Sequence, residues 1–323
     1  MKYDLSIVTP AAPGRLKRVE SLINRLVLNK KTHPNIKFEL ILIENHINKE
    51  YKEICTSNKN LDIKYICVPI DHSIYKYPNP AYMRNCAFRL AEGEYFCLCD
   101  VDWYLSENFI KGAINCQNSD LNVGYVIDSS KGFHAGIAGI PVVDESNPII
   151  KNIIKYNNCI MENSSSLLID DAYKMGNIPR PSIPSAVWMW STNRSNFLYI
   201  HGYDEKFCKL GYGCEDDSLF YRLSNLCKLN KNNYMEMCGI HLHHSQSARG
   251  SSQKTKEHLQ ATRYTPIQNI LHEWGKLTKD SLIIMNNQEF NFNEIESWIE
   301  SNIKDLHPYK YSWENFGELV TKC

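Results

Sequence analysis

The chain has 323 residues, of which 43% are hydrophobic, and its 36 Lys and Arg residues balance its 36 Asp and Glu residues. This length can bury one large hydrophobic core or two modest ones, so we expect one globular unit with appendages. A net charge of zero excludes the broad basic surface that holds nucleic acid through counterion release. The 12 cysteines lie in apolar stretches with no CxxC pair, and the N-terminal sequence matches neither a signal peptide nor a membrane span. We therefore expect a cytoplasmic protein without an integral membrane segment.

Strand-like and helix-like segments alternate over the first hundred residues. Buried strands are predicted at DLSIVTP (4–10), FELILIEN (38–45), IKYICVP (63–69) and EYFCLCDVD (94–102). Helices are predicted at 15–30, where apolar residues recur at helical spacing, and at 80–93, where Gly93 follows the last turn. This alternation predicts an α/β fold with a mostly parallel, Rossmann-like central sheet and helices on both faces.

The pattern weakens between 103 and 185 and then resumes. The next predicted elements are a strand at AVWMWS (186–191), a short helix in TNRSNFLYIHGYDEKF (192–207) and a Gly-rich turn that opens a helix in LGYGCEDDSLFYRLSNL (210–226). A last apolar stretch ends in HLHH (241–244). Beyond the polar segment SARGSSQKTKEHLQ (247–260), which we expect to be a mobile lid, the chain from about 263 to 323 is predicted to be a helical extension.

Two aspartates end the fourth predicted strand. Asp100 and Asp102 supply hard oxygen ligands of the kind that magnesium and manganese prefer, and they lie where open α/β sheets bind ligands. The alternative is a turn in which the aspartates cap the next helix. A DxD pair alone does not decide between these two interpretations.

Further metal ligands are available in the histidine cluster. His241 and His244 lie three residues apart, and imidazole is a poor ligand for magnesium but a good one for manganese or zinc. The alternative is that these histidines are structural or lie on the surface. Together with the DxD pair they favour a Mn²⁺ cofactor, with Mg²⁺ as the alternative ion.

A third cluster of carboxylates opens the helix that follows the Gly-rich turn. Among Glu215, Asp216 and Asp217, one carboxylate can act as a general base toward an acceptor hydroxyl while another orients that hydroxyl. The alternative is simple charge complementarity with the helix N-terminus. Three nearby aromatic residues can stack on sugar rings or belong to the core: Trp188, Trp190 and Tyr212.

The order of these motifs resembles that of inverting GT-A glycosyltransferases. The resemblance lies in SIVTPAAPGRL, LILIEN, AYMRNCAFRLAEGEYFCLCDVDWYL, FLYIHGYDEKFCKLGYGCEDDSLFYRL and HLHHS, between about residues 5 and 247. More narrowly, the chain is similar to enzymes that join a family-two nucleotide-sugar domain to the C-terminal half seen in β-1,4-galactosyltransferases and bacterial chondroitin-type polymerases. It departs from that pattern where EN replaces the paired acids after the second strand and where Cys214 replaces the second glycine of GWGGED.

The resemblance implies a role for each motif. The implied nucleotide-sugar contacts are Thr9, Pro10, Arg15, Glu44, Asn45, Arg84, Asp100 and Asp102. The implied metal ligands are Asp102, His241 and His244, with Asp100 supporting the ribose or the metal. Asp216 matches the catalytic base and Glu215 its acceptor-binding neighbour. The remaining implied acceptor contacts are Trp188, Trp190, Tyr212 and Asp217.

We therefore expect a metal-dependent inverting glycosyltransferase that moves a hexose or N-acetylhexosamine from a UDP-sugar to a glycan or other hydroxyl acceptor, as in polysaccharide biosynthesis. Residues 1–250 form the expected GT-A domain, with a nucleotide-sugar half (1–105) and an acceptor and catalytic half (106–250). Residues 251–323 form the lid and the helical extension, which can dock a second copy or a membrane surface. The alternatives are a metal-dependent sugar nucleotidyltransferase or hydrolase on a similar sheet, and a non-catalytic carbohydrate-binding relative.

Overall fold

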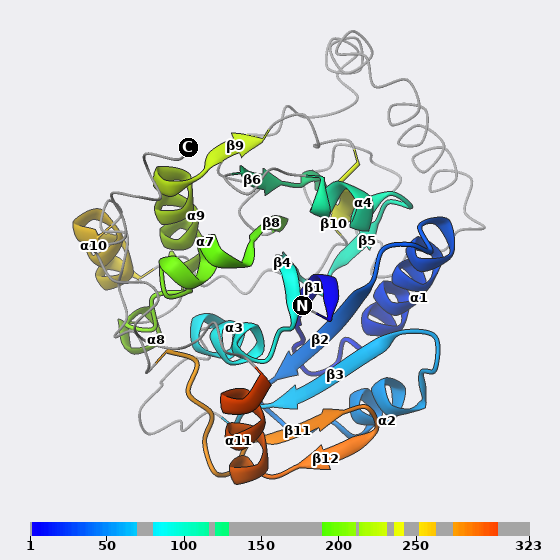
Figure 1. Cartoon of the computed structure of the whole chain (residues 1–323). Helices are drawn as coiled ribbons and strands as arrows, with labels where there is room; N and C mark the ends of the chain where they lie inside the picture. Colours follow the sequence, from blue (N-terminus) through cyan, green and yellow to red (C-terminus); the bar gives the residue numbers. More distant parts are fainter. Residues whose placement is uncertain are drawn as a thin grey trace, which may run out of the picture.

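A nine-stranded mixed sheet forms the centre of the molecule (Figure 1). The structure is a computed structural model that describes residues 2–69, 80–115, 120–128, 189–210, 213–230, 236–241, 252–262 and 274–302. The strands follow the order β12 (Gln288–Phe290), β11 (Leu282–Met285), β3 (Asp62–Cys67), β2 (Phe38–Glu44), β1 (Tyr3–Pro10), β4 (Gly93–Cys99), β8 (Met189–Asn193), β6 (Asp120–Val123) and β9 (Lys228–Asn230). Among these nine strands only β8 and β11 run against the others. The predicted α/β fold with a mostly parallel sheet is thus confirmed.

Helices cover both faces of this sheet. They are α1 (Leu16–Thr32), α2 (Lys49–Ser57), α3 (Pro80–Arg89), α4 (Phe109–Ile114), α7 (Arg194–Tyr199), α8 (Phe207–Leu210), α9 (Glu215–Leu226), α10 (Gln253–Thr262) and α11 (Phe292–Asn302). Side chains of α1, α2 and α4 pack in one hydrophobic core, and those of α3, α7, α9 and α11 pack in a second (Figure 1). None of the described helices combines the length and apolar character that a membrane span requires.

Strand β2 shows why the sequence folds into layers. All seven of its residues are buried, as a strand between two helical layers requires. Because successive side chains point to opposite faces, Leu40 and Leu42 enter the core beneath α1, whereas Ile41 and Ile43 enter the core beneath α3. The cysteines that the structure describes are all free and buried, so they contribute as small apolar residues.

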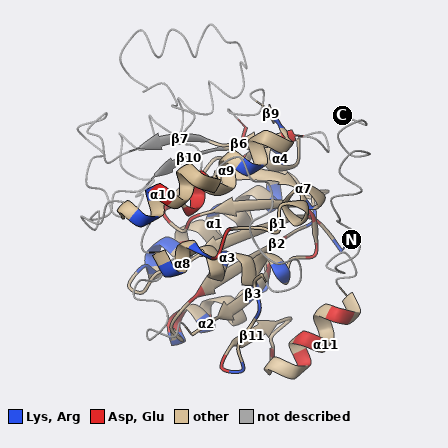
Figure 2. Cartoon of the chain, turned by 90° about the vertical axis from the view of Figure 1, so that its left-hand side faces the viewer, with Lys and Arg blue, Asp and Glu red and all other residues tan. Residues whose placement is uncertain are grey.

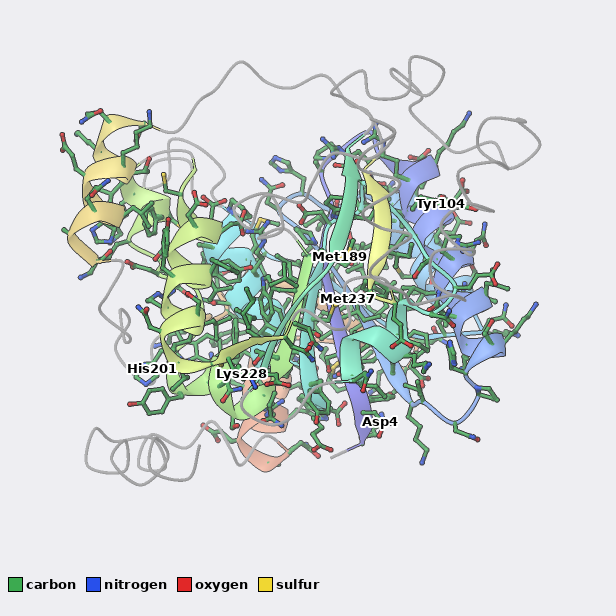
Figure 3. All side chains as sticks on the ribbon, turned by 90° about the horizontal axis from the view of Figure 1, so that it is seen from above. Asp4, Tyr104, Met189, His201, Lys228 and Met237 are labelled. Carbon is green, nitrogen blue, oxygen red and sulfur yellow. The ribbon has the colours of Figure 1, made fainter. Side chains whose placement is uncertain are left out.

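A second, three-stranded sheet lies beside the first. It has the order β5 (Trp103–Leu105), β10 (Cys238–His241) and β7 (Tyr125–Asp128). Met189 and Met237 lie close together near the centre of the molecule, in the core that the two sheets share (Figure 3). A Cβ at Gly124 would overlap the side chain of Met189, so a larger residue there would require that side chain to move.

The C-terminal part of the chain differs from the predicted helical extension. The helix at 292–302 is present, but residues 282–290 form a hairpin whose strand β11 pairs antiparallel with β3 at the edge of the main sheet. Asn286 and Asn287 both have positive φ, at 52° and 61°, as a tight two-residue hairpin turn requires. Asn-Asn is a weaker turn signal than Asn-Gly, and LIIM is too short to distinguish a strand from a helix.

Two side-chain contacts fix these late elements to the rest of the fold. Helix α11 carries acidic side chains along its length (Figure 2), and Glu296 accepts two hydrogen bonds from Arg89 of α3, at 3.1 and 3.2 Å. The polar segment at 247–260 was expected to be mobile, yet its described part belongs to α10. His258 of α10 lies 2.6 Å from the buried carboxylate of Asp204, so this helix is held against the core.

Candidate active site at the carboxyl edge of the sheet

The order in which the chain adds strands to the sheet changes direction at β1. Strands β2 and β3 follow β1 on one side, and the chain then crosses to β4 on the other side. Open α/β sheets bind ligands in the crevice outside the carboxyl ends of the strands at such a point. Thr9 and Pro10 end β1 here, and Asp100 follows the last residue of β4. The Thr9 hydroxyl is buried and has no hydrogen-bond partner among the described residues.

The two aspartates of the DxD pair turn toward different helices. Asp100 continues the alternation of Phe96 and Leu98, which face α3, and its Oδ1 lies 3.4 Å from Nη2 of Arg84. The chain then turns, and Asp102 lies toward α1. In this structure each aspartate is therefore held by guanidinium groups on its own side of the sheet.

Asp102 is paired with two arginines at the start of α1. Its Oδ2 contacts Nη1 of Arg15, and its Oδ1 accepts a hydrogen bond from Nη1 of Arg18. Only 5% of Asp102 is exposed, so little water screens these charges. Arg15 was expected at this site, whereas Arg18 was missed. The signal that could have found Arg18 is its spacing, because residues three apart share one face of a helix.

Arg84 joins the DxD segment to the carboxylates of α9. Its Nη1 donates a hydrogen bond to Asp216, 132 residues away in the sequence, and lies 3.9 Å from Oε1 of Glu215. Arg84 is 3% exposed and its guanidinium lies 5.2 Å from the centre of the Tyr203 ring. Burial alone would lower the pKa of Arg84, but Asp216, Tyr203 and Asp100 outweigh burial and raise it. The guanidinium therefore stays charged.

The carboxylates of α9 have environments suited to accepting a proton. Burial raises the pKa of Asp216 well above its ordinary value, and the guanidinium of Arg84 opposes this shift. Burial likewise raises the pKa of Glu215 and of Asp217. Oε2 of Glu215 is buried with no hydrogen-bond partner among the described residues. A raised pKa makes a carboxylate a stronger base once it has lost its proton.

Glu44 is the last residue of β2, and Asn45 follows it. Glu44 is fully buried, where its Oε1 accepts hydrogen bonds from the Tyr65 hydroxyl and, at 2.9 Å, from the backbone N–H of Asn48. Burial raises its pKa. The expected contact of Glu44 with a nucleotide base is not offered by this conformation, in which Glu44 positions the following loop. Asn45, which is 9% exposed, lies next to it at the end of the strand.

The backbone brings one of the two expected histidines to the DxD segment. Strand β10 pairs antiparallel with β5 so that His241 lies opposite Trp103, the neighbour of Asp102. Its side chain is not described. Carboxylates together with an imidazole form a set of ligands that suits Mn²⁺. The backbone register of β10 and β5 is compatible with such a set. Among the described residues, no three His, Cys, Asp or Glu side chains already converge in the way that a metal site requires.

The expected acceptor contacts are only partly described. Trp188 and Tyr212 lie outside the described residues, as does the expected metal ligand His244. Trp190 is 2% exposed, and its ring stacks on Phe88 and Phe197 at centroid distances of 5.6 and 5.7 Å. In this conformation Trp190 is a core residue and offers no ring face to an acceptor.

Comparisons with known proteins give distant likenesses only. No protein-family model and no curated protein matches the chain. Among the solved structures that match, those described here share 9–15% identity with the chain. Residues 1–349 of TarS from S. aureus share 15% identity over 73% of this chain, with a TM-score of 0.42, or 0.43 for the complex with UDP. This chain covers 57% of that one.

Two further structures contain sugar donors. The mannosyltransferase PcManGT from Pyrobaculum calidifontis, in complex with GDP-Man and Mn²⁺, shares 9% identity over 76% of this chain and 59% of its own, with a TM-score of 0.45. A mutant of Drosophila β-1,4-galactosyltransferase 7, in complex with manganese, UDP-Gal and xylobiose, shares 9% identity over 79% of each chain, with a TM-score of 0.41. The chain itself has an α/β fold whose carboxyl edge gathers the acids of two separate sequence motifs around Arg84.

Proposed function

We propose that the chain is a metal-dependent inverting glycosyltransferase that moves a hexose or N-acetylhexosamine from a UDP-sugar to a hydroxyl of a glycan or related acceptor. One observation carries this proposal. The guanidinium of Arg84 contacts both Asp100, at the end of β4, and Asp216, at the start of α9. The acid expected on the donor side and the acid expected on the acceptor side therefore contact the same arginine side chain.

The donor would bind between β1 and β4. Thr9, Pro10 and Asn45 lie at the carboxyl ends of their strands, where the nucleoside of a bound donor would lie. Asp102, with His241 and His244, would hold Mn²⁺, and Asp100 would support the metal or the ribose. A bound Mn²⁺ would neutralise the charge that develops on the diphosphate leaving group.

The acceptor would bind on the side of α9. Asp216, whose pKa is raised by burial, would take the proton of the acceptor hydroxyl, and Glu215 would orient that hydroxyl. The oxygen would then attack the anomeric carbon as the bond to the diphosphate breaks. A single in-line displacement of this kind inverts the configuration at that carbon and needs no covalent enzyme intermediate.

The test is a screen of nucleotide sugars and acceptors for release of nucleoside diphosphate by the purified chain. The proposal expects UDP release that requires a divalent cation, with Mn²⁺ more effective than Mg²⁺. Asp280→Asn, which removes a carboxylate from an exposed turn, should release UDP like the wild type and is the control for substitutions of the aspartates in the site. Full transfer in excess chelator after verified metal removal would refute the metal requirement. Formation of a UDP-sugar and pyrophosphate from UTP and a sugar 1-phosphate, without release of UDP from any UDP-sugar, would instead identify a sugar nucleotidyltransferase.

A further inference from the structure

Arg84 makes its closest contact with a carboxylate at the expected general base. Its Nη1 donates a hydrogen bond to Oδ1 of Asp216, whereas its Nη2 lies 3.4 Å from Oδ1 of Asp100. Arg84 is 3% exposed and the side chain of Asp216 is 14% exposed, so little water competes for this contact. The family resemblance implies that Arg84 faces the nucleotide. In this structure it faces the acid expected to take the proton of the acceptor.

The guanidinium of Arg84 has a fixed place relative to α9. It lies 5.2 Å from the centre of the Tyr203 ring. Tyr203 is itself fixed to the next residue of α3, because the side chain of Asn85 donates a hydrogen bond to its carbonyl oxygen at 2.9 Å and accepts one from its backbone N–H at 2.8 Å. The ring and α3 therefore hold the guanidinium together, as the placement of a catalytic group requires.

A guanidinium also influences the charge of the acid that it contacts. It has only donors and stays protonated, so it favours the ionised form of Asp216, whose oxygens only accept. Burial and the neighbouring acids raise the pKa of Asp216, and Arg84 opposes them. With Oδ1 bound to Arg84, Oδ2 is the oxygen available for the proton of an acceptor hydroxyl.

The titratable and charged groups around Asp216 come from several elements. They are Arg84 on α3, Asp100 after β4, Tyr203 between α7 and α8, and Glu215 and Asp217 on α9 itself. Of these groups, Arg84 carries the positive charge. Two further charged groups on helices beside α9 contact other partners: Arg194 of α7 donates a hydrogen bond to the carbonyl oxygen of Ala91, and His258 of α10 pairs with Asp204.

We infer that Arg84 is a positioning residue for the general base: its guanidinium fixes Oδ1 of Asp216 and keeps the carboxylate charged, so that Oδ2 accepts the proton of the acceptor hydroxyl. This inference rests on the proposed function and deepens it, because it assigns Arg84 to the acceptor side of the reaction. The proton moves to Oδ2 as the acceptor oxygen bonds to the anomeric carbon. The electron pair of the broken bond leaves with the diphosphate, and Arg84 itself keeps its protons.

The first experiment follows the protonation of Asp216 without donor, acceptor or metal. The full chain is labelled with ¹³C at its aspartate carboxyl carbons, and the NMR signal of Asp216 is identified by its absence from Asp216→Asn. Arg84→Gln should raise the midpoint of this titration by about one pH unit or more. The matched control is Arg89→Gln in the same helix, which removes the partner of Glu296 and should leave the midpoint unchanged.

Arg84→Lys separates the charge from the geometry. A single ammonium keeps the positive charge but cannot reproduce the planar guanidinium that contacts both Asp100 and Asp216. Its midpoint should lie between those of the wild type and Arg84→Gln, about half a pH unit above the wild type. This variant carries the test if Arg84→Gln does not fold. Equal midpoints in the wild type and in every folded Arg84 variant would overturn the inference.

Transfer kinetics at saturating Mn²⁺ give a second readout. The acid limb of the pH profile of kcat/KM should move to higher pH in Arg84→Gln, by the same amount as the NMR midpoint, because the base must be ionised before the hydroxyl attacks. A merely structural role would lower the amount of active protein without moving this limb. If Arg84 instead binds the donor, Arg84→Gln weakens UDP binding with an unmoved midpoint, and that result would refute the positioning role.

The positioning role and the proposed function fail in different ways. If the midpoint moves as expected but the wild type turns over no nucleotide sugar, the proposed function is wrong and Arg84 still controls the charge of Asp216. If the wild type transfers sugar and the midpoint does not move, the proposed function stands and the positioning role is wrong.

Discussion

Arg84 has the most consequential surroundings of any single residue in the candidate site. Arg84 is 3% exposed, and its guanidinium compensates the charge of carboxylates at the end of β4 and in α9. A buried ion pair adds little net stability, but removal of one partner leaves a buried charge without compensation. The effect of Arg84 on stability should therefore be much larger than that of an arginine near the surface.

Arg84→Gln should lower the free energy of unfolding by about 3–5 kcal/mol. The matched control is Arg89→Gln in the same helix, where the ion pair with Glu296 is partly exposed and should contribute about 1 kcal/mol or less. Urea unfolding of both variants at neutral pH measures the difference. Similar losses in the two variants would show that Arg84 does not compensate buried charge as described.

At the scale of elements, Glu205 ties three segments together. Its carboxylate accepts hydrogen bonds from Asn85 of α3 at 2.8 Å and from the backbone N–H of Gly275 at 2.6 Å. Gly275 has a φ of 61°, and a Cβ there would lie 2.6 Å from the carbonyl oxygen of Asn85. The segment that leads to β11 is therefore docked on α3 through a site that only glycine fits.

This docking should make stability depend on pH. Burial raises the pKa of Glu205 from 4.5 to about 7, so the folded state binds a proton that the unfolded state has released. The corresponding stability is fully present below pH 4.5 and is lost as pH rises through 7. Urea unfolding at both pH values should show that the free energy of unfolding falls between pH 5 and pH 8 by about 2–3 kcal/mol more in the wild type than in Glu205→Gln. Glu300→Gln, on the exposed side of α11, is the control and should behave like the wild type.

Elements with strong local signals were predictable from the sequence. The four buried strands of the first hundred residues, helices α1 and α3, and the start of α9 at Glu215 match the predicted segments. The hairpin at 282–290 was missed, because its pairing with β3 is a contact between distant parts of the chain. The helix at 253–262 was also missed, since its attachment depends on the contact between His258 and Asp204 rather than on its own polar sequence.

At the scale of the whole molecule, the sheet explains how the site is assembled. Parallel strands end at a common edge, so residues after β1 and β4 come together whatever their distance in sequence. That much follows from the strand pattern. The contacts between side chains do not follow from it, because only the three-dimensional packing shows that Arg84 contacts Asp216. The same holds for the contacts of Asp102 with Arg15 and Arg18. The same packing puts Trp190 in the core rather than on an acceptor surface.

The most direct test of the proposed activity compares two isosteric substitutions. Asn keeps the shape of Asp but loses the charge that holds a cation and the basicity that accepts a proton. Asp102→Asn should chiefly weaken Mn²⁺-dependent UDP binding, measured by calorimetry. Asp216→Asn should leave that binding nearly intact and lower the transfer rate by about a hundredfold to ten-thousandfold. Wild-type turnover in Asp216→Asn, and in the corresponding Glu215→Gln and Asp217→Asn variants, would contradict a glycosyltransferase mechanism based on these acids.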